Sequence, residues 1–160
     1  MGFRQWVRDH FVTADAVYGL ILYSALIAGV SDDHSEALEV LVFAAASLII
    51  FWGAHVFAGT VANHGAELGL PAALWRALGH SSGMLYAAIL PSLALLLGVF
   101  TLTSADDAVS IALLVATVVL GVLGFYAFSQ RRRPVVIRIL GGLGTALFGL
   151  LMILLNIIVH

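Results

Sequence analysis

Five apolar stretches recur along this chain of 160 residues, and each approaches or exceeds the ~20 residues that a helix needs to cross a bilayer. Hydrophobic residues make up 62% of the sequence and charged residues only 10%, against roughly 45–50% and 25% in soluble domains. A soluble domain of this size would lack the polar surface to cover itself, whereas helices that face lipid need very little. The sequence therefore predicts an all-α, polytopic integral membrane protein whose surroundings are the lipid bilayer.

The apolar stretches predict where the helices lie. Five transmembrane helices are expected at about 14–30, 37–60, 84–103, 108–128 and 135–159, all within one helical domain. Amphipathic patterns at about 2–12 and 70–79 predict two further helices that lie on the membrane surface. Pro71 is well placed for the start of the second of these, because proline is favoured at the first position of a helix.

The charges predict how the chain is threaded. The turns at 31–36 and 104–107 are acidic and fall on one side of the membrane. The seven cationic residues all fall on the other side, and all are arginine: Arg4, Arg8, Arg76, Arg131, Arg132, Arg133 and Arg138. The positive-inside rule then places the N-terminus in the cytoplasm and the C-terminus outside. The absence of lysine fits a GC-rich bacterial genome, so we expect the bacterial inner membrane.

Several classes of function are excluded or disfavoured by composition. The chain has no cysteine, which removes disulfides and thiolate ligands, and its net charge of −2 gives no reason to expect a nucleic-acid partner. Ser81 and Ser82 lie beside His80, but no GxSxG motif surrounds them. We therefore expect no enzyme activity and no required cofactor.

A polar stripe runs along one face of the stretch 48–67. Within it, His55 is predicted inside the hydrocarbon core, and Asp15 lies at a similar depth on the preceding helix. An ionisable residue inside the membrane indicates a functional site, because burying it without a partner costs several kcal/mol. We predict a path for a cation or protons along Asp15, His55 and Asn63, with Glu67 at its mouth. The alternative is that Asp15 and His55 only hold two helices together.

Two other groups of residues give weaker predictions. His64 and Glu67 are three residues apart, and His80 could approach them, so these three could bind Zn²⁺, Fe²⁺ or Mn²⁺; the alternative is that they are simply solvated. Gly141, Thr145 and Gly149 recur every four residues in the last helix. Small residues at that spacing allow close helix packing, either within the protomer or against a second copy, although glycine is common in membrane helices generally.

The pattern of helices and two local motifs resemble the vacuolar iron transporter family. The first helix reads DAVYGLILYSALIAGV at 15–30, and the stretch PAALWRALGHSSGMLYAAILPSLALLL resembles the entry to that family's third span. The resemblance covers nearly the whole chain and implies five membrane helices and metal transport. However, Leu22 stands where the family has its metal-conducting Asp, Ile21 stands where it has the adjacent Asn, and the Glu-rich cytoplasmic domain is missing.

A second resemblance is to the lysosomal potassium channel family. TADAVYG at 13–19 is similar to the start of that family's first span, and FWGAH at 51–55 is similar to an aromatic and histidine pattern in its second span. Thr13 and Ala14 replace the Phe and Ser of the family's motif.

Three hypotheses follow for function. The first is a small transporter or channel-like protein for a cation or protons, which is expected to be a homodimer because five helices enclose little interior. The second is a structural or accessory membrane subunit. The third is a metal sensor that uses His64, Glu67 and His80.

Overall fold

The computed structural model describes residues 13–30, 36–64, 69–101, 104–129 and 134–159, so the predicted surface helix at about 2–12 lies outside the described residues. The predicted all-α fold is confirmed for this part of the chain. The described helices are α2 (Ala14–Val30), α3 (Ala37–Asn63), α4 (Leu70–Phe100), α5 (Ala105–Ser129) and α6 (Val135–Val159).

Four of these helices are long and apolar enough to cross a membrane, namely α3, α4, α5 and α6. The remaining helix, α2, is also apolar but has only 17 residues. At 1.5 Å per residue it is about 26 Å long, slightly less than a hydrocarbon core of about 30 Å. These are the properties of an all-helical membrane protein.

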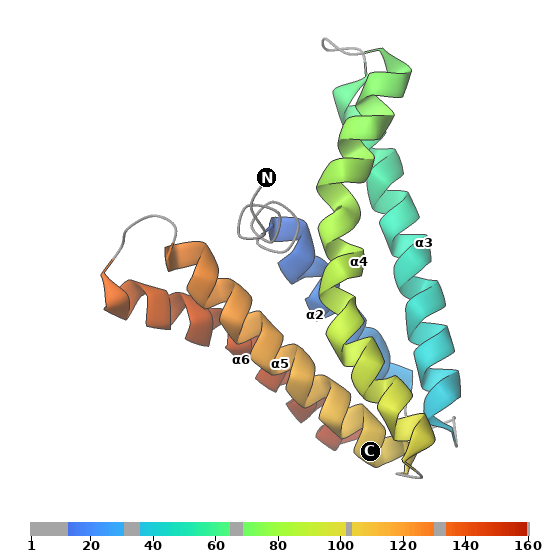
Figure 1. The fold of residues 1–160 in the computed structure, drawn as a ribbon, viewed down its shortest axis with the longest axis vertical. Helices are drawn as coiled ribbons and strands as arrows, with labels where there is room; N and C mark the ends of the chain where they lie inside the picture. The colour runs from blue at the N-terminus through green and yellow to red at the C-terminus, as the bar shows by residue number, and fades with distance from the viewer. Residues whose placement is uncertain (1–12, 31–35, 65–68, 102–103, 130–133, 160) are drawn as a thin grey trace.

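The helices form two hairpins that meet at one end (Figure 1). One hairpin consists of α3 and α4, and the other of α5 and α6. The hairpins approach each other where α4 leads into α5 and separate toward the end at which α2 begins. Helix α2 contacts all four of the other helices, so it joins the two hairpins.

Small residues allow α2 to occupy this central position. A Cβ atom added to Gly19 would lie 2.6 Å from the Cα of Met84, so the backbones of α2 and α4 can approach only because position 19 has no side chain. One helical turn further along, the hydroxyls of Tyr23 and Ser92 are 2.7 Å apart and satisfy each other in an apolar environment. Around them lies a core formed by Ile27, Met84, Leu95, Leu113 and neighbouring apolar side chains.

The structure corrects the predicted division of the segment 70–103. The predicted surface helix at about 70–79 and the predicted span at about 84–103 are one continuous helix, α4, which ends at Phe100. The polar, glycine-rich composition up to residue 83 had suggested a boundary between two helices. Ser81 and Gly83 instead continue the buried face of α4, on which every third or fourth residue faces the protein interior: Ala73, Ala77, Ser81, Met84, Ala88, Pro91, Leu95 and Gly98. Helix α3 continues past the predicted span at about 37–60 and ends at Asn63, in agreement with the expectation that this helix extends beyond the membrane.

Gly141, Thr145 and Gly149 all face α5. The Oγ1 atom of Thr145 is 2.7 Å from the carbonyl oxygen of Leu120 on α5, and a Cβ atom at Gly149 would lie 2.7 Å from the Cα of Thr117. Of the two possible neighbours that the sequence left open, the structure places α5 of the same chain against these small residues.

We predict that Gly149→Ala lowers the free energy of unfolding by about 1–3 kcal/mol, because the new methyl group has no room against the backbone of α5. Gly144→Ala is the matched control on the same helix, since no atom lies within 4 Å of the position that its Cβ would take. Thermal unfolding of both variants in detergent measures the difference. Equal midpoints for the two variants would contradict the close packing of α5 on α6.

Candidate functional site

The site is built at the first turn of α2. The Oγ1 atom of Thr13 accepts a hydrogen bond of 3.1 Å from the backbone N–H of Ala16, which is the geometry of a helix N-cap. Asp15 therefore lies in the first turn of the helix, where the partial positive charge of the helix N-terminus favours a carboxylate. Only 8% of the Asp15 surface is exposed. A buried acidic group is thus held at the end of α2.

Two imidazoles from two other helices approach this carboxylate. The Nε2 atom of His55 on α3 lies 3.5 Å from Oδ1 of Asp15, and Nε2 of His80 on α4 lies 3.8 Å from Oδ2. Both separations exceed the ~2.7–3.2 Å of a typical hydrogen bond. Oδ2 is buried and accepts no hydrogen bond from the described residues. The carboxylate is therefore flanked by two nitrogen groups and retains capacity to accept a proton or a hydrogen bond.

The imidazole of His55 also contacts an aromatic ring on α2. Tyr18, one helical turn after Asp15 on α2, stacks on the imidazole with ring centroids 6.2 Å apart and an angle of 28° between the planes. This contact restricts rotation of the imidazole and directs it across the start of α2.

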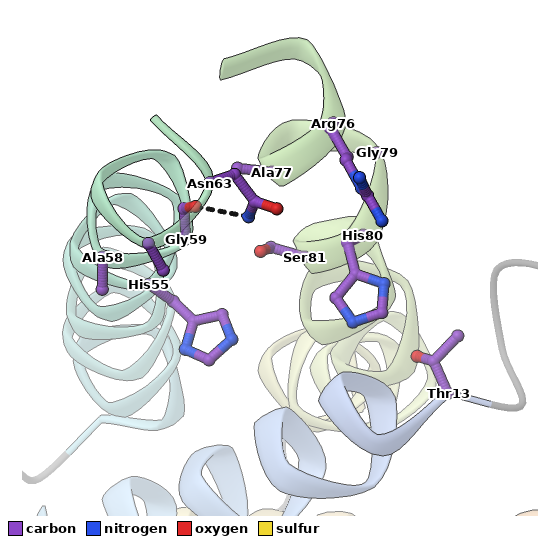
Figure 2. Close-up of a pocket in the computed structure, with 11 residues that line it drawn as sticks. Thr13, His55, Ala58, Gly59, Asn63, Arg76, Ala77, Gly79, His80 and Ser81 are labelled. Carbon is purple, nitrogen blue, oxygen red and sulfur yellow. Dashed lines mark hydrogen bonds between the residues drawn. The ribbon is translucent and has the colours of Figure 1, made fainter. Parts of the chain in front are cut away.

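A cavity of about 640 Å³ lies between α3 and α4 beside these groups (Figure 2). Its lining combines small apolar residues with polar side chains from three segments of the chain. The polar members are Thr13, His55, Asn63, Arg76, His80 and Ser81. Figure 2 shows His55 and His80 reaching from opposite helices toward the start of α2.

Two polar groups of the lining are oriented by their helices. The Nδ2 atom of Asn63 donates a hydrogen bond of 2.7 Å to the carbonyl of Gly59, and the amide oxygen points toward α4 (Figure 2). Ser81 is 2% exposed and lines the cavity. Its hydroxyl points into the space between α3 and α4 (Figure 2). The hydroxyl is therefore accessible to water or a ligand from the cavity.

Beyond Asp15, the interior of the bundle is largely apolar. Besides Asp15 and Ser81, the buried polar side chains of the described residues comprise only Ser24, whose hydroxyl donates to the carbonyl of Leu20 at 2.8 Å. Further along, the interior consists of apolar side chains, the Tyr23–Ser92 pair and the indole Nε1 of Trp52, which is buried without a hydrogen-bond partner among the described residues. Within the described part of one chain, the cavity therefore reaches His55 and His80, the two imidazoles that flank Asp15, and none of its lining residues comes from the other end of the bundle.

The structure brings some of the predicted residues together and separates others. Asp15 and His55 are neighbours, and Asn63 lies in the same cavity. Glu67 lies outside the described residues. His64 is exposed at the end of α3, whereas His80 contacts Asp15. Within the described ranges, no group of three or more His, Cys, Asp or Glu side chains could hold a metal ion.

Sequence reasoning did not identify Arg76, Tyr18 or Ser81 as parts of this site. Arg76 and His80 are four residues apart, and Ala77 and Ser81 form the adjacent row, so on a continuous helix both rows line the cavity. The sequence analysis predicted separate helices at about 70–79 and 84–103, so these residues were not expected to lie on one continuous helix.

Comparisons with protein-family models, with curated proteins and with solved structures found no match for this chain. The function must therefore be argued from the site itself.

We predict that Ser81→Cys reacts with a water-soluble thiol reagent, because the cavity connects this buried position to solvent. Ser24→Cys is the matched control, since Ser24 is 1% exposed and does not line the cavity. The chain has no native cysteine, so mass spectrometry of the labelled protein reports the introduced thiol alone. Equal labelling of the two thiols would show that burial in the helix bundle, and not the cavity, decides access.

Proposed function

We propose that this protein is a small membrane transporter or channel-like protein that moves protons through Asp15, His55 and His80. One observation carries the proposal: a buried carboxylate with an unpaired oxygen lies between two imidazoles beside an open cavity. Carboxylates and imidazoles inside membranes commonly form proton relays. Histidine is suited to this role because one ring nitrogen can accept a proton while the other donates one.

Protons fit this cavity better than a metal cation does. Arg76 lines the cavity and repels an approaching cation, whereas a proton can pass between fixed groups. The resemblance to iron transporters does not change this preference. At the two positions where that family carries its Asn and metal-conducting Asp, Ile21 and Leu22 pack against the apolar core.

The proposed transfer is a relay between neighbouring groups. A proton taken up by His80 or His55 from water in the cavity makes that imidazole a cation beside Asp15. Transfer to the free Oδ2 of Asp15 then neutralises the carboxylate and restores a neutral imidazole. Asn63 lines the cavity above these groups, and Glu67 is proposed at its mouth.

The proposed proton path beyond Asp15 requires polar groups that the described interior of one chain does not supply. Because the described interior beyond Asp15 is apolar, we propose that a second copy completes the path at a subunit interface. An accessory subunit without transport remains the alternative, and it is favoured by the same apolar interior. In that case the Asp15 cluster would only join α2 to the α3–α4 hairpin.

The proposal includes a threading of the chain. We propose that α2 is a fifth, short span, since short helices can be accommodated by local thinning of the bilayer. The arginine-rich end, with the N-terminus and the cavity, would face the cytoplasm of a bacterial cell, and the C-terminus would lie outside.

We predict that Asp15→Asn reduces proton flux by at least about a hundredfold, the low end of what a positioned proton-transfer group contributes. His55→Leu should also stay folded and lose flux. Asp107→Asn is the control, because it makes the same chemical change in the first turn of α5. Purified proteins in liposomes with a pH-sensitive dye report the flux. If folded His55→Leu protein conducts like the parent, the pathway is wrong.

If the threading is right, a membrane-impermeant thiol reagent labels Ser81→Cys from the cytoplasmic side and Ser104→Cys from the outside. The two serines lie toward opposite ends of the fold, at the cavity and just before α5. Intact cells and inverted vesicles provide the two sides. Labelling of both positions from the same side would contradict the orientation.

A further inference from the structure

The lining of the cavity is rich in hydrogen-bond donors and positive charge. It contains the guanidinium of Arg76, the imidazoles of His55 and His80, and an amide and two hydroxyls, but no carboxylate among the described lining residues. Asp15 lies beneath and is flanked by the two imidazoles. Apart from moving protons, this chemistry suits an anionic ligand.

The donors that face the cavity from α4 are arranged on adjacent rows of one helix. Arg76 and His80 are four residues apart on one row of α4, Ser81 lies on the neighbouring row, and all three line the cavity (Figure 2). Ser81 is 2% exposed as a residue, and its hydroxyl points into the space between α3 and α4. No ion pair between described residues involves Arg76. A guanidinium and a hydroxyl that face the cavity are thus both available to a ligand.

The depth of the cavity in the bilayer indicates which class of anion could bind there. Measured along α4 from Phe100, Arg76 lies about 36 Å away at 1.5 Å per residue, and His80 about 30 Å away. A hydrocarbon core is about 30 Å thick, and the bilayer with its headgroups about 40–45 Å. If α4 crosses from its Phe100 end, Arg76 lies in the headgroup layer, where the phosphates of lipids are found.

We propose that this cavity binds a phosphate group through Arg76, His80 and Ser81. The planar guanidinium can donate two parallel hydrogen bonds to phosphate oxygens, and the serine hydroxyl and a protonated imidazole can each donate one. The cavity volume of about 640 Å³ lies within the ~300–1,000 Å³ of small-molecule sites. The phosphate belongs either to a phospholipid headgroup or to a free anion. This site shares His80 with the proposed proton transfer, but the binding of phosphate does not require that transfer.

The test measures binding of two probes to the delipidated, purified protein by isothermal titration calorimetry. Inorganic phosphate represents the free anion, and a short-chain phosphatidic acid below its micellar concentration represents the headgroup. Binding of at least one probe is expected. Arg76→Gln should weaken it by at least about tenfold, since a hydrogen bond to a charged group is lost, and Ser81→Ala should weaken it by a smaller factor.

The control is Arg138→Gln, which removes the same charge from α6, outside the cavity. Arg76→Lys retains the charge but not the planar fork, so intermediate binding is expected. Binding of phosphatidic acid alone assigns the site to a lipid headgroup, and binding of inorganic phosphate assigns it to a free anion. The proposal is overturned if neither probe binds the parent, or if Arg76→Gln and Arg138→Gln reduce binding equally. Proton flux of Arg76→Gln, measured in parallel, separates this result from the relay.

Discussion

One buried carboxylate flanked by two imidazoles is the polar constraint around which three helices of this bundle meet. Asp15 lies on α2, His55 on α3 and His80 on α4, so their contacts lie where the three helices come together at one end. A buried charge without partners would cost several kcal/mol, and the two imidazoles offset part of that cost. The close approach of the α2 and α4 backbones at Gly19 also helps to hold α2 between the hairpins.

The apolar stretches predicted the long helices closely, because a bilayer leaves few alternatives to a helix once a segment is long and uncharged. The error concerned the segment 70–83, where Gly79, Ser81 and Gly83 indicated a turn. In the structure Ser81 and Gly83 lie on the packed face of α4 and Gly79 is exposed, and tertiary contact along that face outweighs the weak intrinsic preference of these residues for helix. The sequence of α4 alone does not show that contacts with neighbouring helices compensate for this weak preference.

The site was predicted in part. The pairing of Asp15 with His55 followed from equal depth on two helices, and the structure places them side by side. His80 was grouped with His64 and Glu67 because it was expected near the end of a separate surface helix, from which it could approach them. Only a continuous α4 brings His80 to Asp15 and aligns Arg76 and Ser81 with the cavity, so the error in the fold carried over into the site.

The contact between Asp15 and His55 is tested most directly by a double-mutant cycle on the free energy of unfolding, with Asp15→Asn, His55→Gln and the double variant. The account predicts a favourable coupling of about 0.6–1.7 kcal/mol, the scale found for polar contacts between membrane helices. If the two single effects add to within about 0.3 kcal/mol, the carboxylate and the imidazole do not interact, and the site described here would lose its basis.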